Sequence, residues 1–527
     1  MKLPIFVIPL VAVSCLLAVL GPQFSSDWTS FFDNYASAWS SVSSPSETED
    51  FRSNTTAAVN DSVSNHSVSS PFSSSPPPPP PPSSSWSSSS PPPPIDEKQS
   101  LPQLPNMTTV NAVLEETAIN EGRNVSSEGN YEPAVVKSRK QREFTKLEKI
   151  EAGLRRARAA IKEAKFLNQT HDPDLVPNGP MYWNAKAFHR SYLEMEKELK
   201  IFVYEEGEPP LFHNGPCKSI YSTEGNFIHA IEMDTRFRTK DPDKAHVFFL
   251  PLSVAMLVQF VYVRDSHDFT PIRRTVIDYV NVIRTKYPFW NRTLGADHFM
   301  LSCHDWGPEA SRSVPHLYKN SIRVLCNANT SEGFNPSKDI SFPEINLQTG
   351  FLTGIIGGPS PSRRPILAFF AGGLHGPIRP ILIQQWENQD SDVQVHKYLP
   401  KDVSYIDMMR KSKFCLCPSG YEVASPRIVE AIYTGCVPVL ISDHYIPPFS
   451  DVINWKSFSV SVSVKDIPNL KTILQGISSR QYLRMYLRVV KVRRHFEVHS
   501  PPKRFDVYHM ILHSVWLRRL NLRVRDR

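Results

Sequence analysis

The sequence predicts an α/β protein with two Rossmann-like domains facing a cleft, preceded by a membrane anchor and a disordered stem. Short apolar runs alternate with helical or loop segments after residue 195, which is typical of parallel sheets covered by helices on both faces. The turn-rich stretch 354–365 (GIIGGPSPSRRP) divides these runs into two groups. The first 135 residues differ in composition from both groups, and we treat them separately.

The first segment is a nearly unbroken apolar run at residues 3–20, just long enough to span a bilayer. Lys2 precedes it, and the next basic residue is Arg52. This asymmetry predicts a cytoplasmic tail at residues 1–2 and a type II signal anchor. A cleaved signal peptide is the alternative. Either reading places the body of the protein in the secretory pathway.

Residues 21–135 are rich in Ser, Pro, Thr and Asn and include runs of proline at 76–82 and 91–94. Such a segment cannot bury enough apolar surface to offset its ordering entropy, so we expect a disordered lumenal stem. Six cysteines outside the apolar run are expected to form disulfides in an oxidising lumen, in a pairing that the sequence does not reveal. Expected N-glycosylation sites begin Asn-x-Ser/Thr triplets at Asn54, Asn60, Asn65, Asn106, Asn124, Asn168, Asn291 and Asn329.

Two charged segments flank the predicted core. Residues 137–167 space apolar side chains three and four apart, which predicts an amphipathic helix that either dimerises the protein or docks on the core. Residues 501–527 are predicted to form a basic C-terminal helix. The basic stretch 480–527 that includes it is read either as a surface for an acidic polysaccharide or phosphate or as a solvated helix face. We expect the helical tail 482–522 to cross back to the first domain. The net charge of +7 is mild and does not indicate nucleic acid.

The core divides into a first domain at 195–355 and a second at 365–500. Each is built on apolar strands, and the expected strands are 201–204, 246–250, 298–302, 322–326, 366–370, 414–417 and 437–441. In sheets of this kind ligands bind beyond the carboxyl ends of the strands. Candidate site residues are therefore sought there.

The most informative segment is 418–448 (PSGYEVASPRIVEAIYTGCVPVLISDHYIPP). It follows a strand at 413–417 and predicts a turn, a helix over 425–434 ended by Gly435, and a strand at 437–441. The N-terminus of such a helix favours an anion, usually a phosphate. Arg427, in its first turn, could contact a diphosphate at two points. The alternative is an ordinary strand–helix unit in which Glu430 is an exposed helix residue.

This segment resembles the exostosin-type glycosyltransferases, especially their plant cell-wall group. Further matching stretches occur in the family's order within about residues 195–500: KIFVYEEGEPPLFH at 200–213, YSTEGNFIHAIE at 221–232, DPDKAHVFFLPLS at 241–253, DHFMLSCHDWGP at 297–308, KDISFPE at 338–344 and FFAGGLHGPIR at 369–379. The resemblance implies the two-domain arrangement called GT-B, a Golgi location and inversion at the anomeric carbon.

Transfer from a nucleotide diphosphate sugar requires neutralisation of the leaving diphosphate. We assign this to Arg379 and Arg427. Arg379 follows the glycine-rich loop 371–376, which lets backbone approach a ligand. Ser419 and Gly420 are expected to give N–H contacts to the phosphate, Glu430 to bind the ribose hydroxyls, and Glu422 to orient the donor sugar.

Transfer also requires a base for the acceptor hydroxyl. We assign Asp305, with His304 as the alternative, because both follow the strand 298–302. Trp306 beside them could stack on a sugar ring. The competing reading is that His304 and Asp305 only cap a turn before Gly307 and Pro308.

No obligatory metal and no cofactor are expected. Asp-x-Asp strings, which hold a cation in transferases of another fold, occur at 172–174, 241–243 and 390–392, but none follows a strand in the expected way. The predicted function is transfer of a sugar from a UDP- or GDP-sugar to a cell-wall polysaccharide or glycoprotein in the Golgi lumen. The alternatives are a silent scaffold subunit of a synthase complex, as a homo- or hetero-oligomer, and a secreted lectin-like binder.

Overall fold

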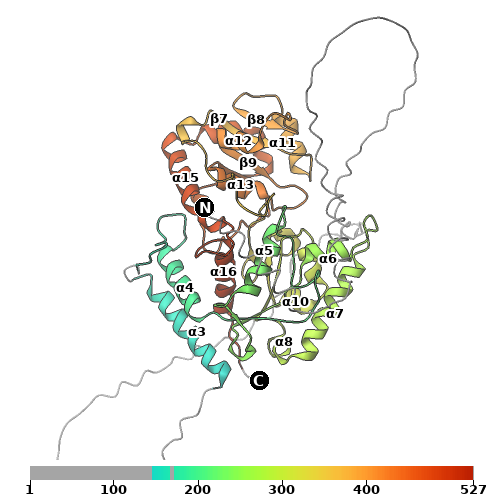
Figure 1. Ribbon diagram of the computed structural model, residues 1–527. Coiled ribbons are helices and arrows are strands. Elements are labelled where there is room, and N and C mark those ends of the chain that lie inside the picture. Colours follow the sequence, from blue (N-terminus) through green and yellow to red (C-terminus); the bar gives the residue numbers. More distant parts are fainter. Residues whose placement is uncertain (1–144, 167–170, 526–527) are drawn as a thin grey trace, which may run out of the picture. The chain divides into compact units, whose positions relative to one another are not determined.

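The computed structural model describes residues 145–166 and 171–525 (Figure 1). The predicted tail, anchor and stem (1–135) lie outside these residues, as do the sequons at Asn54, Asn60, Asn65, Asn106, Asn124 and Asn168. Among the helices described, none combines the length and apolar character needed to cross a bilayer.

The first sheet has six strands in the order β2-β1-β3-β4-β5-β6, and every neighbouring pair is parallel. Its strands are β1 (Ile201–Val203), β2 (Arg238–Thr239), β3 (Val247–Phe249), β4 (His298–Ser302), β5 (Ile322–Leu325) and β6 (Ile340–Ser341). The connecting helices are α5 (Ser222–Met233), α6 (Val254–Phe260), α7 (Thr270–Lys286), α8 (Pro288–Thr293), α9 (Gly307–Arg312) and α10 (Pro315–Lys319).

Both faces of this sheet are buried, as alternating strand positions show. Phe249 and Leu301 pack with Phe227 of α5, whereas Phe248 and Met300 pack in a separate cluster with Val276 of α7. Successive side chains of a strand point to opposite faces, so a run such as Val247–Phe249 must be apolar throughout. The parallel pairing and two-sided burial confirm the predicted α/β class.

The second sheet has five parallel strands in the order β11-β10-β9-β7-β8. They are β7 (Ile366–Ala371), β8 (Val393–His396), β9 (Ser412–Pro418), β10 (Val437–Ile441) and β11 (Val460–Val462). Its helices are α11 (Ile378–Trp386), α12 (Tyr405–Lys411), α13 (Pro426–Thr434), α14 (Leu470–Gln475) and α15 (Ser479–Val492). The turn-rich stretch 354–365 separates the two sheets in the sequence.

All seven expected strands are present within a residue or two at their ends, and β4 and β10 match their predicted bounds. Four strands were missed: β2, β6, β8 and β11. They are two to four residues long, too short for a periodic signal, and all four lie at the edges of their sheets. β8 begins at Val393, directly after the Asp-x-Asp string at 390–392.

The N-terminal helices α3 (Lys146–Glu163) and α4 (Ala185–Glu198) pack on the body. Leu154 and Ala157 of α3 are fully buried, and Arg158 donates to the carbonyls of Leu520 and Leu522 at 2.6 and 3.0 Å. The sequence left open whether this helix dimerises the protein or docks on the core, and the structure shows docking on the core. Residues 137–144 of the predicted helix lie outside the described range.

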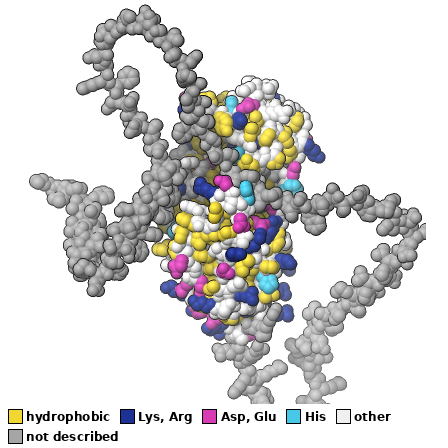
Figure 2. Space-filling model, turned by 90° about the vertical axis from the view of Figure 1, so that its right-hand side faces the viewer, with side chains coloured by type: hydrophobic (Ala, Val, Ile, Leu, Met, Phe, Trp, Pro, Cys, Tyr) yellow, Lys and Arg dark blue, Asp and Glu magenta, His cyan; other side chains and the backbone are white. Residues whose placement is uncertain are grey.

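The C-terminal helix α16 (Val507–Asn521) crosses back to the first domain, where it packs against α4 and β5. It is a buried helix, so the basic-surface readings do not hold for α16, but they stay open for the exposed Arg480, Arg484 and Lys491 of α15. Arg519 donates to the carbonyl of His246 at 2.7 Å and pairs with Glu151 of α3, and Arg518 pairs with Asp451 at 3.0 Å. On the face shown in Figure 2, charges of both signs are interspersed with apolar side chains, in keeping with the mild net charge.

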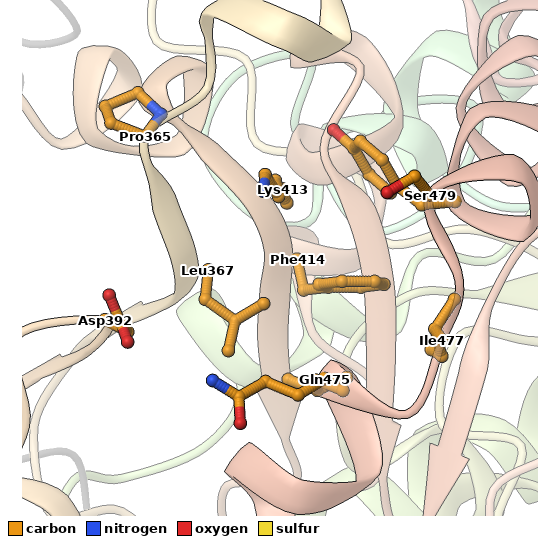
Figure 3. A pocket seen from close by; sticks show the side chains of 10 residues that line it. Pro365, Leu367, Asp392, Lys413, Phe414, Gln475, Ile477 and Ser479 are labelled. Carbon is orange, nitrogen blue, oxygen red and sulfur yellow. The ribbon is translucent and has the colours of Figure 1, made fainter.

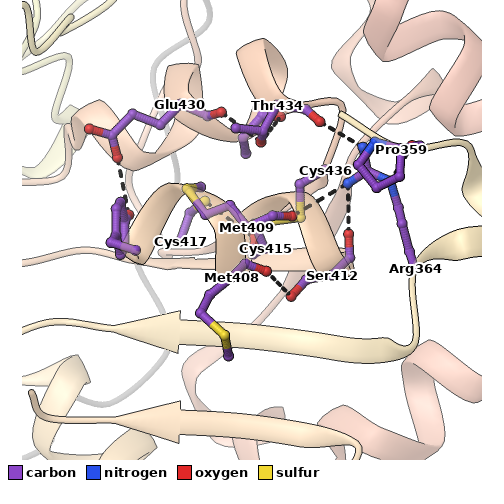
Figure 4. The surroundings of a disulfide bond; sticks show 12 residues. Pro359, Arg364, Met408, Met409, Ser412, Cys415, Cys417, Glu430, Thr434 and Cys436 are labelled. Atoms are coloured by element: carbon purple, nitrogen blue, oxygen red, sulfur yellow. Dashed lines mark hydrogen bonds between the residues drawn. A yellow bond between two sulfur atoms is a disulfide. The ribbon is translucent and has the colours of Figure 1, made fainter. Parts of the chain in front are cut away.

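One disulfide in each sheet cross-links two neighbouring strands. Cys303–Cys326 joins the carboxyl ends of β4 and β5, and Cys415–Cys436 joins β9 to the start of β10 (Figure 4). Beside the second disulfide lies the buried Arg364, which donates to the carbonyls of Pro359, Ser412 and Thr434 at 3.2, 2.9 and 2.6 Å. One guanidinium group thus donates hydrogen bonds to backbone carbonyls at the end of α13 and the start of β9.

We expect Arg364→Leu to lower the free energy of unfolding by roughly 3–5 kcal/mol, since several buried carbonyls lose their donor at once. Chemical denaturation of the purified protein measures this. Arg363→Leu is the matched control, because Arg363 is exposed and bonds weakly, at 3.4 Å, to Ser360. Equal stability of the two variants would contradict the role assigned to Arg364.

Candidate functional site

The predicted site residues lie at the carboxyl ends of strands in both sheets. Asp305 follows β4, Arg379 lies in α11 after β7, and Glu422 follows β9. Glu344, which the sequence analysis did not single out, follows β6. The electrostatic neighbours of Glu344 are Asp305 from the first sheet and Glu430, Arg379 and Arg427 from the second. The two strand-end groups therefore converge on one site.

Two guanidinium groups form the cationic side of this site. Arg427 lies at the second position of α13, where it donates to the carbonyl of Ala371 at 3.0 Å and covers the ring of Phe370. Arg379 lies close to it. Burial, together with the charge of Arg427, lowers the pKa of Arg379 to about 10. A buried and a half-buried cation whose charges repel each other form a place where a dianion relieves that repulsion.

Glycines in the loop after β7 and the turn after β9 allow this pairing. A Cβ at Gly372 would stand 2.8 Å from Nη2 of Arg427, and one at Gly420 would stand 2.9 Å from Nη2 of Arg379. Gly376, with φ of +69°, lies against the carbonyl of Gly420, where a Cβ would come within 1.8 Å. These glycines make room for the arginine side chains and for each other. The sequence analysis predicted instead that the glycines of loop 371–376 let the backbone approach a ligand.

The expected N–H contacts of Ser419 and Gly420 need correction. The Ser419 N–H donates to the carbonyl of Ile441 at 3.2 Å, continuing the pairing of β9 with β10, and the Gly420 N–H donates to the carbonyl of Glu422 at 3.0 Å within the turn. The Ser419 hydroxyl, in contrast, is free to bind a ligand: it is buried and has no hydrogen-bond partner among the described residues. At the start of α13, the side chain of Ser425 makes no capping bond. The first turn of that helix therefore keeps its capacity for an anion.

Carboxyl groups form the other side of the site, and burial controls their protonation. Burial raises the pKa of Asp305 to about 6, against a hydrogen bond from Tyr221 that lowers it. Burial and the nearby Asp305 and Glu332 raise the pKa of Glu422 to about 9, so Glu422 is protonated at neutral pH. Burial also raises the pKa of Glu344 well above its usual range.

Of the two candidate bases, the geometry favours Asp305. Nδ1 of His304 accepts the N–H of Trp306 at 3.0 Å, and burial lowers the pKa of His304 to about 3. A histidine in this state is a poor proton acceptor. Asp305 lies in the turn before Gly307, as the turn-capping alternative predicted. Its pKa of about 6 nevertheless suits a general base near neutral pH. Trp306 packs edge-on against Tyr262 and Phe269.

Asp305 is held in place by its neighbours. The disulfide Cys303–Cys326 ties the strand end before it, and the Asn327 amide donates to the Asp305 carbonyl at 3.2 Å and to Glu332 at 3.2 Å. The cysteine pairing was not predictable from the sequence, which shows six candidate cysteines. The free ones among the described residues are Cys217 and Cys417.

Glu224 of α5 is a positioning residue that the sequence analysis missed. Its fully buried carboxylate accepts the N–H groups of Cys303 at 2.7 Å, His304 at 3.3 Å and Ala255 at 3.0 Å, and the hydroxyl of Ser253. A buried carboxylate with four donors fixes the backbone directly before Asp305. The available signal was a glutamate within the stretch 221–232, which matches the family.

We expect Glu224→Gln to lower kcat at least tenfold while leaving UDP affinity within about twofold. The amide has one acceptor oxygen and turns an NH2 group toward donors, so the loop before Asp305 shifts. Steady-state kinetics and a separate UDP titration measure the two effects. Glu232→Gln serves as comparison, because Glu232 lies on the same helix but binds His213 and Arg238 and not the loop before Asp305. Parallel loss of UDP binding would show that Glu224 supports the fold as a whole.

The remaining predicted donor residue, Glu430, is buried on α13, and the alternative of an exposed helix residue is wrong. Its Oε2 accepts the hydroxyl of Tyr405 at 3.0 Å, which holds the carboxylate toward Arg427. At the outer edge of the site, the exposed rings of His375 and Tyr421 stack with centroids 5.3 Å apart.

The three Asp-x-Asp strings lie away from this site and have local partners. Asp172 and Asp174 bind Arg504, Asp241 caps a short 3₁₀ turn, and Asp390 and Asp392 bind Lys471. Within residues 145–166 and 171–525, no group of three His, Cys, Asp or Glu side chains is arranged to hold a metal ion. Metal independence stays a prediction.

The two described sequons differ. Asn291 is exposed, and its amide donates to the Arg284 carbonyl at 2.9 Å. Asn329 is only 8% exposed; its Nδ2 donates to Glu332 at 2.9 Å and its Oδ1 accepts Ser331. The low exposure of the Asn329 side chain, which caps the turn Thr330–Glu332, disfavours the expected glycan there in the folded protein.

Comparison with known proteins adds the family. Residues 195–477 match the model of the exostosin GT47 domain. The chain belongs to the exostosin GT47 family. A probable glycosyltransferase of Arabidopsis thaliana is 70% identical to this GT47 protein over 403 residues, 76% of this chain and 77% of that one. The probable beta-1,4-xylosyltransferase IRX10 of the same plant is 27% identical over 353 residues, 60% of this chain and 82% of that one.

Among solved structures, Anabaena HepE in complex with UDP is 12% identical to this GT47 protein. It covers 59% of this chain and 97% of its own length with a TM-score of 0.32, too low to carry an argument. The GT47 domain and the sequence relatives identify the chain as a glycosyltransferase.

Proposed function

We propose that this GT47 glycosyltransferase moves a sugar from a UDP- or GDP-sugar to a cell-wall polysaccharide or glycoprotein acceptor, with inversion and without a metal. The observation that carries the proposal is the pair Arg379 and Arg427 facing the carboxyl groups of Asp305 and Glu344. Cations opposite a base are what transfer from a diphosphate donor requires.

Each residue has a defined task in this proposal. Arg379, Arg427 and the Ser419 hydroxyl hold the diphosphate and stabilise the charge that develops on it as the glycosidic bond breaks. Glu430 accepts the ribose hydroxyls. Glu422, protonated at neutral pH, donates a hydrogen bond to the donor sugar. Asp305 takes the proton of the acceptor hydroxyl as that oxygen attacks the anomeric carbon.

We further propose a type II Golgi membrane protein with a lumenal catalytic body. The apolar run at 3–20, the sequon at the exposed Asn291 and the two disulfides support this location. The names of the Arabidopsis relatives, which include a probable xylosyltransferase, support a cell-wall acceptor.

The test is a screen of the full-length protein, in detergent, against UDP- and GDP-sugars with plant-wall oligosaccharide acceptors, with and without chelator. We expect turnover of one donor, unaffected by chelator. Binding of a nucleotide sugar without turnover, alone and with partner subunits, would favour the scaffold alternative. Activity that is lost in chelator and restored by manganese would contradict metal independence.

A further inference from the structure

The side of the donor site that faces the arginine pair is rich in carboxyl groups. Asp305 follows β4, Glu332 ends the short turn after β5, Glu344 follows β6 and Glu422 follows β9. The charges of the first three all act on Glu422, so we call the four groups the carboxyl wall. Asp305, Glu332 and Glu422 are only half-buried, which leaves the wall accessible to a ligand.

The carboxyl wall holds more hydrogen-bond acceptors than donors. The Asn327 amide lies among its members, where Nδ2 donates to the Asp305 carbonyl and to the Glu332 carboxylate, both at 3.2 Å. Oδ1 of Asn327 and Oε2 of Glu422 have no hydrogen-bond partner among the described residues. Carboxylate and amide oxygens accept hydrogen bonds, and the hydroxyl groups of a sugar can donate them.

The groups around Asp305 bring no positive charge to the carboxyl wall. Burial raises the pKa of Asp305, a hydrogen bond from Tyr221 lowers it, and the charge that acts on it is the carboxylate of Glu332. Arg312 donates to the backbone carbonyl of Glu332 at 2.6 Å, but its guanidinium group pairs with Glu309 at 3.0 Å. The negative charge of Asp305 and Glu332 is therefore not offset locally.

The arginine pair and Lys413 do not offset it for a donor sugar either. Arg379 and Arg427 act on Glu344, but in the proposed function they hold the diphosphate. Lys413, the second residue of β9, lines a separate cavity of about 300 Å³ at the amino ends of β7 and β9 (Figure 3). The donor residues follow the carboxyl ends of the same strands, and a seven-residue strand such as β9 spans roughly 20 Å. Lys413 therefore lies out of reach of the donor sugar.

We infer that the donor sugar of this enzyme is neutral and that the carboxyl wall excludes uronic acid donors. The inference rests on the proposed function and names the substrate class of the same site. A neutral sugar brings hydroxyl groups that donate to the wall. A uronate brings a further carboxylate, which Asp305 and Glu332 repel in a poorly hydrated place. A single hydrogen bond from the protonated Glu422 does not offset a charge that has left water.

The experiment compares nucleotide sugars that differ only in having a hydroxymethyl group or a carboxylate at C6. The full-length protein in detergent is titrated by calorimetry with UDP-glucose and UDP-glucuronate, UDP-galactose and UDP-galacturonate, and GDP-mannose and GDP-mannuronate. In the pair whose neutral member binds most tightly, we expect the uronate to bind at least about 30-fold more weakly, because it meets like charges at short range.

The double variant Asp305→Asn/Glu332→Gln removes two negative charges from the carboxyl wall and keeps the shapes of both side chains. It should reduce the difference between the two members of the pair at least tenfold, by strengthening binding of the uronate. Binding of the neutral member should change less than threefold, which also shows that the variant is folded. The matched control is Asp265→Asn/Asp278→Asn, since both carboxylates are exposed and lie outside the wall. It should keep the wild-type difference.

Two results would overturn the inference while leaving the proposed function intact. The first is equal affinity of the wild type for the neutral and the uronate member of the pair. The second is a difference that the Asp305→Asn/Glu332→Gln variant keeps in full, because the discrimination would then depend on shape and not on charge. Failure of UDP, GDP and all their sugars to bind would instead overturn the proposed function, and this inference with it.

Discussion

Asp305→Asn is expected to reduce kcat by 100-fold to 10,000-fold and to leave UDP affinity unchanged. The asparagine side chain has the shape of aspartate but cannot accept a proton, and a positioned base contributes about this factor. Tyr221, the nearest hydrogen-bond donor to this carboxyl group, can still bond to the amide oxygen. The substitution therefore isolates proton transfer from structure. Steady-state kinetics with the donor found in the screen, and calorimetry with UDP, measure the two parts.

The wild-type pH profile follows from the same carboxyl group. Because burial raises the pKa of Asp305 to about 6, the base is protonated and inactive below that pH and ionised above it. The rate should therefore fall tenfold per unit as pH drops below about 6 and level off above 7. This acid limb should be absent from the residual activity of Asp305→Asn.

Glu309→Gln is the matched control, since Glu309 lies four residues further along and binds Arg273 and Arg312 at 3.3 and 3.0 Å. It should keep both the rate and the pH profile. Full activity in Asp305→Asn would exclude Asp305 as the base. Loss of both the activity and the acid limb in His304→Gln would return His304 to that role.

Arg427→Lys is expected to weaken UDP binding by about 100-fold, or ~3 kcal/mol. A lysine keeps the charge but loses the two-point contact with phosphate and the stacking on Phe370. Arg379→Lys should act in the same direction.

Calorimetry with UDP and with uridine separates the phosphate contacts from the base contacts. Uridine carries no phosphate, so its weaker binding should be the same in the wild type and in both arginine variants. Arg363→Lys is the control, as an exposed arginine outside the site. If the affinity for uridine fell as far as that for UDP, the arginines would be supporting the pocket's structure and not the diphosphate.

The sequence predicted the central framework of this protein well, for identifiable reasons. β4 and β10 are buried on both faces and therefore read as continuous apolar runs with clear ends. Gly435 ends α13 in the left-handed conformation expected of a glycine there. The rule that ligands bind at strand ends led to Asp305, Arg379 and Glu422, which the structure brings to one place.

What the sequence did not show depends on contacts between distant residues. Glu344 follows β6, which has only two residues and leaves no strand pattern to search. The readings of Gly372 and Gly420 missed their arginine neighbours, which come from α13 and α11. The arginines of α16 suggested an exposed helix. In the structure their guanidinium groups pair with Glu151 and Asp451, which lie far from α16 in the sequence, so the helix is buried. No local pattern records such pairings.

The most direct test of the account is a crystal structure of the protein with UDP bound. The account predicts diphosphate oxygens within hydrogen-bonding distance of the guanidinium groups of Arg379 and Arg427 and of the Ser419 hydroxyl. It also predicts that Asp305 stays on the facing side. UDP bound elsewhere, with Arg427 still donating to Ala371 and both arginines turned from the nucleotide, would contradict it.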